Sequence, residues 1–553
     1  MADVVHSSLT SRSRWSGLKI MAILVAAVLA LPILVVLINV LISDGDVWTH
    51  LYQTVLAEYV SNSLLLMLGV GAGVLLIGVP CAWFTSMYEF PGRTFLSWAL
   101  LLPMAFPAYI IAYTYTGILD FAGPVQTLIR ELTGWRYGEY WFFEVRSLGG
   151  AMVMLTLVLY PYVYLMSRAA FLEQSENIME VSRTLGYSSQ RAFFKLALPL
   201  ARPAIVTGLT LALMETLADY GTVQYFGVST FTTGILRTFY GFGDITAASQ
   251  LAGVLLMFVA VLILLERYSR RRIQYHSSGL KKASHRRVVL RGKQAVMARV
   301  FCFLPIVVGF FIPVIVLGYW ALFKAEVPGA NFVELAWNSF YLAALASLVV
   351  VSLALVLSYA IRLNNRARSV RVSVGIAGLG YALPGTIIAI GVIVPLAWLD
   401  HRIINFVRDY TGHNLGLIFS GTLFALLFAY TVRFMAVSLG AVQNGLGKIK
   451  PSMDMAGRSL GLSPYKVLRQ IHLPLLKGSV LTAVLIVFVD VLKELPATFV
   501  LRPFNFNTLA VRAFELASDE RLIDAAPASL MIVLVGLVPV ILLSRSISSR
   551  VGH

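Results

Sequence analysis

The sequence predicts an all-α polytopic membrane protein of about twelve transmembrane helices in two tandem six-helix halves. Three observations lead to this fold class. Hydrophobic residues make up 58% of the 553 residues and charged residues only 13%, about half the charged share of a typical soluble protein. The apolar residues gather in long uncharged runs, and a helix needs about 20 such residues to cross a bilayer. The sequence also repeats itself at a fixed spacing.

Ten uncharged runs are long enough to span a membrane. They cover residues 20–43, 59–88, 94–119, 147–167, 245–265, 300–323, 335–361, 372–399, 414–432 and 525–544. Two shorter apolar runs stop at Glu215 and Asp490, and the sequence beyond each acid is apolar again. We interpret each of these as a spanning helix that contains acidic residues, which brings the total to twelve. The first run is too long for a signal peptide and has no cleavage site, so we expect it to be retained.

Basic residues predict the orientation of the chain. Segment 267–297 holds ten Lys and Arg residues and no acid, and loop 362–371 holds four more Arg. Cytoplasmic loops of membrane proteins collect such residues. Counting from a cytoplasmic N-terminus places both segments, the two long polar loops 168–202 and 433–477, and the C-terminus in the cytoplasm. The net charge of +17 is therefore a topology signal, and we expect no nucleic-acid partner.

An internal repeat divides the chain. Residues 185–199 read LGYSSQRAFFKLALP, and residues 460–474, 275 positions later, read LGLSPYKVLRQIHLP. Six helices in each copy give both copies the same membrane orientation, so we expect a pseudo-two-fold axis along the membrane normal. The predicted domains are a first half at 1–266, a basic cytoplasmic linker at 267–297 and a second half at 298–553.

Each half carries one motif in a long polar loop. Glu180, Gly186 and Pro199 mark the motif within loop 173–202. Asp454, Gly461 and Pro474 mark it within loop 441–477, where Met455 stands at the position of Glu180. Both copies resemble the coupling loop, Glu-Ala-Ala, three residues, Gly, nine residues, Ile-x-Leu-Pro, of permease subunits in binding-protein-dependent ATP-binding-cassette importers. The resemblance covers nearly the whole chain and is of the fused type, in which one polypeptide supplies both halves.

The resemblance implies that these two loops are sites of ATPase coupling. Two short helices that meet at a glycine turn would form an elbow, and we expect Pro199 or Pro474 to end the second helix before the next span. The sequence contains no G-x-x-x-x-G-K-[ST] phosphate loop, so ATP would bind to partner subunits. We expect two copies of an ATPase subunit, no enzymatic activity in this chain and no intrinsic cofactor.

Four acids interrupt the two shorter apolar runs. Glu215 and Asp219 are four residues apart, on one helix face, and Asp490 and Glu494 repeat that spacing. A charged residue at bilayer depth costs about 2.5–3.5 kcal/mol, so such residues usually face a cavity or a partner. Four carboxylates suit a hard cation, and Pro496 is expected to break the second helix. Alternatively, the acids form structural ion pairs with basic residues such as Lys493, Arg237 or Arg512.

The segments around these acids, 215–235 and 490–520, resemble the ferric-iron branch of the family. The resemblance implies a permease of the bacterial inner membrane that transports Fe(III) from a periplasmic iron-binding protein. A fused permease for another substrate, such as thiamine, is the main alternative. An ion-coupled secondary transporter, with the acids as proton or sodium sites, is a second alternative, but it leaves the paired loops unexplained.

Overall fold

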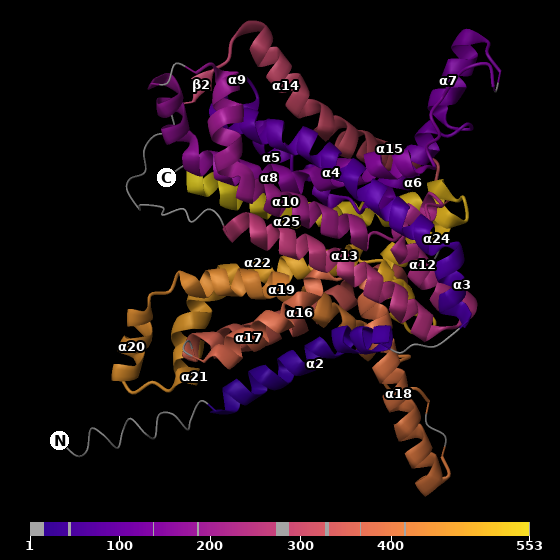
Figure 1. Ribbon diagram of the computed structural model, residues 1–553, viewed down its shortest axis with the longest axis vertical. Helices are drawn as coiled ribbons and strands as arrows, with labels where there is room; N and C mark the ends of the chain where they lie inside the picture. Colours follow the sequence, from indigo (N-terminus) through magenta and orange to yellow (C-terminus); the bar gives the residue numbers. More distant parts are fainter. Residues whose placement is uncertain are drawn as a thin grey trace. The chain divides into compact units, whose positions relative to one another are not determined.

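The computed structural model describes residues 16–41, 46–136, 138–184, 187–271, 287–326, 331–364, 367–413 and 416–551 (Figure 1). These residues are almost entirely helical, with one pair of two-residue strands. Eleven of their helices are long and apolar enough to cross a membrane, and one bent helix pair makes a possible twelfth. The predicted polytopic all-α fold class is confirmed.

The described residues belong to two compact units. The larger unit consists of Asp46–Phe242, Val254–Pro328 and Arg512–His553, and the smaller unit consists of Met1–Gly45, Gly243–Gly253 and Gly329–Val511. Two helices run from one unit into the other, namely α13 (Ile245–Arg271) and α24 (Leu509–Ser518).

The larger unit contains most of the first predicted half together with two helical stretches that lie mostly in the second, 292–323 and 522–551. Its elements are α3 (Asp46–Thr54), α4 (Leu56–Met87), β1 (Tyr88–Glu89), α5 (Arg93–Ala99), η1 (Leu102–Ala105), α6 (Ala108–Leu119), α7 (Pro124–Thr133), α8 (Leu148–Thr184), α9 (Ser189–Ala192), η2 (Phe193–Ala197), α10 (Leu198–Ala218), α11 (Gly221–Tyr225), α12 (Phe231–Arg237), η3 (Thr238–Phe242), β2 (Val288–Val289), α14 (Gly292–Ile306), η4 (Val307–Phe311), α15 (Ile312–Phe323) and α25 (Leu522–Val551).

The smaller unit contains the first helix of the chain and most of the second predicted half. Its elements are α2 (Ser16–Leu41), α16 (Asn331–Leu363), α17 (Arg368–Ala377), η5 (Leu379–Ala382), α18 (Gly385–Thr411), α19 (Leu423–Gly447), α20 (Pro451–Ser459), α21 (Pro464–Val467), η6 (Leu468–His472), α22 (Leu473–Lys493) and α23 (Pro496–Leu501).

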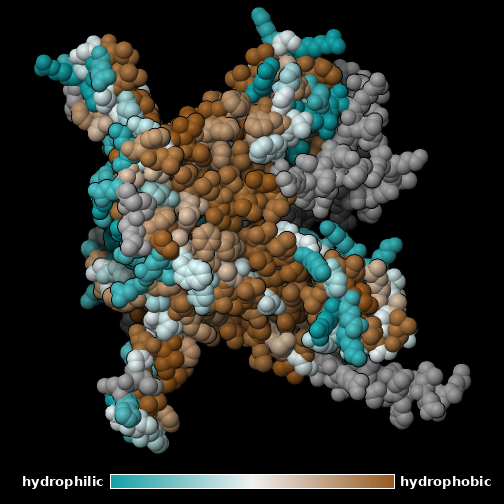
Figure 2. All heavy atoms as spheres, turned by 180° about the vertical axis from the view of Figure 1, so that it is seen from behind, coloured by the Kyte–Doolittle hydropathy of each residue, from teal (hydrophilic) through white to brown (hydrophobic). Residues whose placement is uncertain are grey.

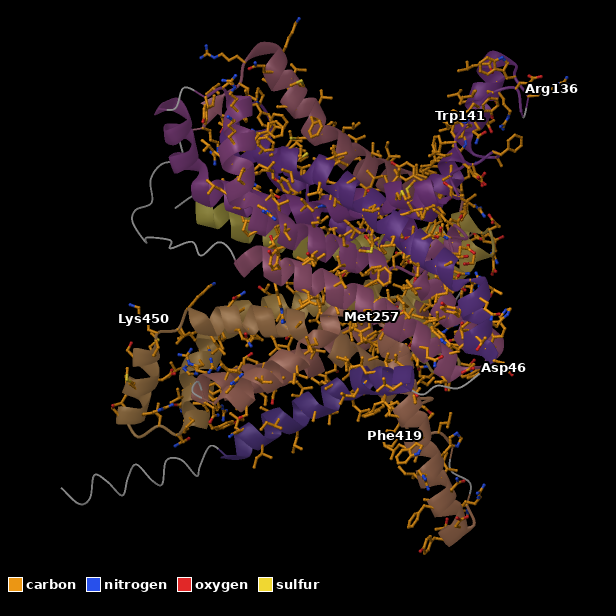
Figure 3. All side chains as sticks on the ribbon, in the orientation of Figure 1. Asp46, Arg136, Trp141, Met257, Phe419 and Lys450 are labelled. Atoms are coloured by element: carbon orange, nitrogen blue, oxygen red, sulfur yellow. The ribbon has the colours of Figure 1, made fainter. Side chains whose placement is uncertain are left out.

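The outer surface of the helices is apolar. Figure 2 shows hydrophobic side chains over most of the visible helix surface, with hydrophilic side chains toward the helix ends. Leu76 on α4 is 71% exposed and Met257 on α13 (Figure 3) is 66% exposed. Soluble monomers rarely expose contiguous apolar surface of this extent. This surface is therefore suited to contact with lipid, as the sequence predicts.

Two predicted spans are interrupted by a proline. The run predicted at 94–119 is divided into α5, η1 and α6, and the chain bends by 91° at Pro107. The run predicted at 372–399 is divided in the same way, into α17, η5 and α18, at Pro384. The residue before a proline avoids the helical region. Phe106 and Leu383, which precede the two prolines, accordingly have extended backbones, with ψ 131° and 134°.

The first helix of each sequence half belongs to the compact unit that the other half mainly forms. In the smaller unit, α2 from the first half packs against α17 and α18 of the second. A side chain at Gly391 of α18 would approach the carbonyl oxygen of Pro32 in α2 to 2.4 Å, so only glycine allows this approach. In the larger unit, η4 packs beside α6, where the Tyr115 hydroxyl donates to the carbonyl of Val308 at 2.6 Å. The compact units thus differ from the sequence halves, whose boundaries stay a prediction.

Candidate functional site

The first pair of membrane acids lies where a spanning helix ends and a short helix begins. Helix α10 ends at Ala218, Asp219 has an extended backbone (φ −65°, ψ 131°), and α11 begins at Gly221. Oδ1 of Asp219 accepts hydrogen bonds from the backbone N–H groups of Thr222 (3.0 Å) and Val223 (3.1 Å). Oδ2 accepts a hydrogen bond from the Thr222 hydroxyl at 3.0 Å. The carboxylate therefore caps α11, whose first N–H groups have no partner within the helix.

The second half repeats this arrangement. Helix α22 ends at Lys493, Glu494 is extended (φ −70°, ψ 124°), and α23 begins at Pro496. Oε1 and Oε2 of Glu494 accept hydrogen bonds from the backbone N–H groups of Ala497 and Thr498, both at 3.0 Å. The acid and its partners lie 275 residues after those of the first half. Glu494 is 5% exposed, so this carboxylate faces the protein interior.

Hydroxyl groups complete both breaks. The carbonyl of Asp219 accepts a hydrogen bond from the Thr232 hydroxyl at 2.7 Å, and the carbonyl of Glu494 accepts one from Thr498 at 2.8 Å. The carbonyls released by the breaks therefore have partners. Pro496 does accompany the second break, as predicted, but Gly221 holds the equivalent position in the first. A capping acid is common to both breaks, whereas the proline is not.

The remaining two acids have different surroundings. Asp490 forms an ion pair with Lys493, 2.9 Å from Oδ1 to Nζ, which is the ion-pair alternative. The capping acid Glu494 also forms an ion pair, with Nη1 of Arg433 4.0 Å from its Oε1. Glu215 is half-buried on α10 and forms no ion pair with any described residue.

The acids form a pair within each unit. Glu215 and Asp219 belong to the larger unit and Asp490 and Glu494 to the smaller. Among the described residues, no group of three or more His, Cys, Asp or Glu side chains is placed to hold a metal ion. The assignment of the four acids to a substrate pathway stays a prediction.

The second polar loop contains the predicted glycine turn. Helix α20 begins just after Lys450, which Figure 3 labels at the turn that follows α19. It ends before Gly461, whose φ of 77° is left-handed and favours glycine. The N–H of Leu462 donates to the carbonyl of Gly457 at 3.0 Å, which closes the turn. Helix α21 follows at Pro464. Two short helices that meet at a glycine are therefore present.

The prediction that Pro199 and Pro474 end a helix is wrong. The chain stays helical through both prolines, because a π-helical turn precedes each one: η2 before Pro199 and η6 before Pro474. Leu198 and Leu473 donate to the carbonyls of Phe193 and Leu468, five residues earlier. The wider π turn accommodates the proline ring, which would clash with the carbonyl four residues earlier in a regular helix.

Asp454 is the centre of a buried cluster in the second loop. Arg362, near the end of α16, donates to both oxygens of Asp454, from Nε at 2.9 Å and from Nη2 at 3.1 Å. Nε2 of His472 lies 2.6 Å from Oδ1 of Asp454, and His472 is 1% exposed. Burial favours the neutral acid, but the hydrogen bonds from Arg362 and His472 outweigh it and hold the pKa of Asp454 below its usual range.

The same cluster fastens the loop to α16. Arg362 also donates to the carbonyls of Leu446 and Ile449, at 2.7 Å and 3.0 Å, near the end of α19. The hydroxyl of Tyr359 on α16 donates to the carbonyl of Pro464 at 2.7 Å, and its ring packs against His472. Both arms of the elbow are therefore anchored to one helix.

The sequence patterns do not reveal the roles of Arg362 and His472. Arg362 lies in a basic loop that indicates topology, and a histidine in a loop is usually solvated. The available signal is a difference between the repeats, because the positions 275 residues before Asp454 and His472 are Met179 and Ala197. Two polar side chains that one copy has and the other lacks indicate a mutual contact.

The first loop is described only in part. Glu180 lies on the backbone of α8, but its side chain is outside the described set, and Gly186 is outside the described residues. Pro199 is exposed at the start of α10.

Comparison with known proteins supports a transport role. Residues 74–275 match the family of the binding-protein-dependent transport system inner membrane component. An Fe(3+)-transport system permease protein of Haemophilus influenzae is 27% identical over 96% of this chain and 98% of its own length. A ferric transport system permease protein of Actinobacillus pleuropneumoniae is 23% identical over 80% of this chain and 64% of its own length.

A shorter relative matches one part of the chain. A molybdenum transport system permease protein of Haemophilus influenzae is 24% identical over 37% of this chain and 89% of its own length. The chain is thus about twice as long as this relative and about as long as the first one. Over residues 74–275 it resembles the inner membrane component of binding-protein-dependent transport systems.

Proposed function

We propose that this chain is the permease subunit of an ATP-binding-cassette importer that carries ferric iron across the bacterial inner membrane. A periplasmic binding protein would deliver the iron, and two copies of an ATPase subunit would bind at the two cytoplasmic loops. Both termini would lie in the cytoplasm. The observation that carries the proposal is the relative of nearly equal length that is named an Fe(3+)-transport system permease.

A continuous helix connects each predicted ATPase site to a membrane break. The helical run Pro464–Lys493 begins at the second elbow and ends at the break capped by Glu494. At 1.5 Å per residue, its 30 residues measure about 45 Å, more than the hydrocarbon core of a bilayer. In the first half, the run from α9 through η2 and α10 ends in the same way at Asp219. A displacement of either elbow would therefore move the break at the other end of a stiff rod.

The capped and uncapped acids would have separate roles. Both oxygens of Asp219 and of Glu494 are engaged with the following short helix, so we assign these two acids to holding the breaks in shape. Glu215 and Asp490 lie one turn earlier on the same rods and would face the iron. Carboxylate oxygens are suitable ligands for a hard trivalent cation in transit.

Substitution at the uncapped acids tests this assignment. The double variant Glu215→Gln/Asp490→Asn should lose at least tenfold in the rate of radioactive iron uptake by reconstituted vesicles. Assembly with the ATPase should be unchanged, because neither side chain contacts the loops. An uptake rate equal to that of the unmodified protein would remove these acids from the pathway.

Reconstitution with the partners tests the function itself. The purified chain, with its ATPase subunit in nanodiscs, should hydrolyse ATP several-fold faster when an iron-loaded binding protein is added. A thiamine-loaded binding protein is the control for the alternative substrate. Stimulation by thiamine alone would assign the chain to that substrate, and uptake without any ATPase would make it a secondary transporter.

A further inference from the structure

Two arginines of the larger unit pair with one carboxylate, and a third arginine lies near them. The parallel pairing of β1 with β2, Tyr88 opposite Val288, places Arg287 beside Glu89 with Nη1 3.7 Å from Oε2. Arg93, at the start of α5, pairs with the same oxygen from Nε at 3.0 Å. It also donates to the carbonyl of Thr85 at 3.2 Å. Two guanidinium groups therefore share one acid.

Arg168 is the third arginine of this group. It lies on α8 one turn after Tyr164, whose hydroxyl donates to the carbonyl of Ser97 at 2.7 Å. Tyr164 thus holds this face of α8 against α5. Arg168 is 8% exposed, and its Nε has no hydrogen-bond partner among the described residues. It also forms no ion pair with any acid in the described part of the chain.

The group has more positive charge than its protein neighbours balance. Among the described residues, Glu89 is the acid that pairs with Arg93 and Arg287, and none pairs with Arg168. Burial lowers the pKa of Arg287, and the nearby charges of Arg93 and Arg168 lower it further against the opposing effect of Glu89. A buried charge without a counter-charge is costly. An additional anion would balance this excess of positive charge.

The position of the group indicates which anion it binds. Each arginine lies at or near the end of a candidate span: Arg93 just after Leu56–Met87, Arg168 near the end of Leu148–Leu172, and Arg287 just before Gly292–Phe323. Span ends lie at the depth of lipid phosphates. On α14, close to this end of its span, Met297 is 63% exposed and apolar, so this part of α14 is suited to contact with lipid.

We propose that Arg93, Arg168 and Arg287 form a binding site for the phosphate of an anionic phospholipid headgroup. Guanidinium groups bind phosphate oxygens through paired hydrogen bonds, and basic pockets between spanning helices are known hosts of anionic lipids. Arg287 belongs to the segment that joins the two sequence halves, whereas Arg93 and Arg168 belong to the first half. A bound headgroup would therefore fasten this segment to α5 and α8.

Retention of lipid by single variants tests the site. The full chain is purified from membranes, and the phosphatidylglycerol that remains bound is counted by native mass spectrometry. The unmodified chain should retain this lipid at the site, and Arg168→Gln or Arg287→Gln should lower its occupancy at least fivefold. Lys293→Gln is the matched control, since Lys293 is an exposed basic residue on the same segment. Equal occupancy in all four proteins would overturn the proposal.

Thermal unfolding separates a lipid from other phosphates. In nanodiscs, the unfolding midpoint of the unmodified chain should be higher with phosphatidylglycerol than with phosphatidylcholine, and Arg287→Gln should abolish the difference. The Arg287 side chain is only half-buried, so this variant is expected to fold. If millimolar inorganic phosphate raised the midpoint in phosphatidylcholine nanodiscs as much as phosphatidylglycerol does, the site would instead be assigned to free phosphate. A midpoint independent of lipid and phosphate would show that the arginines need no anion.

Discussion

At the scale of single residues, one carboxylate can decide whether a loop is fixed or free. Asp454 has Arg362 on one side and His472 on the other, and all three side chains are mostly buried. We expect Asp454→Asn to destabilise the second loop by about 2–3 kcal/mol, since hydrogen bonds to a charged group are lost and Arg362 is left without its counter-charge. Thermal unfolding in detergent measures this. Asp409→Asn, at an exposed side chain, is the control and should leave the midpoint unchanged.

The same carboxylate makes stability depend on pH. Its pKa in the folded protein lies below the value of about 3.9 expected for an unfolded chain. The stabilisation is therefore fully present above pH ~4 and is lost as the pH falls through the folded pKa. Unfolding midpoints measured from pH 6 down to pH 3 should fall less steeply for Asp454→Asn than for the unmodified chain. Parallel curves would contradict the assigned role.

The capping acids make a second prediction at this scale. Asp219→Ala removes the acceptor for two N–H groups of α11 and should cost about 1–2 kcal/mol. Asp219→Asn keeps one side-chain oxygen as an acceptor and should cost less than half as much stability as Asp219→Ala. Thermal unfolding distinguishes the two variants. If both substitutions were equally mild, the cap would not be what holds the break.

At the scale of helices, the shape of each break depends on what packs against it. A side chain at Gly385, the first residue of α18, would lie 2.6 Å from Oε1 of Glu494 and 2.7 Å from Nη1 of Arg433. Gly385→Ala should therefore displace the Glu494 cap and cost about 1–3 kcal/mol. Gly375→Ala on α17, where no atom lies within 4 Å, is the matched control. Equal unfolding midpoints for the two variants would show that the cap can shift without cost.

At the scale of the whole molecule, the exchange of helices makes the two sequence halves depend on each other. Helix α2 buries its face against α17 and α18, and α14 and η4 pack against elements of the first half. We therefore expect residues 1–266 and residues 298–553, expressed separately, to be degraded. Expressed together, they should purify as one complex. Two stable separate halves would show that these exchanged contacts are dispensable.

Much of the fold was predictable because its signals are local. Hydrophobicity over about 20 residues identifies a span wherever the chain folds, and this gave the fold class. The repeat also pairs Glu494 with Asp219 from the sequence alone. Hydrophobicity does not reveal where a span is interrupted, because Pro107 and Pro384 lie inside uninterrupted apolar runs.

The candidate site was predictable only in part, because its contacts join distant residues. The spacing of Arg362 and Asp454 along the chain does not reveal that α16 and α20 meet. Likewise, the sequence cannot distinguish an acid that binds substrate from one whose oxygens accept hydrogen bonds from neighbouring backbone N–H groups. The sequence alone determined the class of membrane protein, the repeat and the elbow glycine Gly461. Only the tertiary structure decided the capping roles of Asp219 and Glu494, the π turns before the prolines and the exchanged helices, since each depends on a partner brought near by folding.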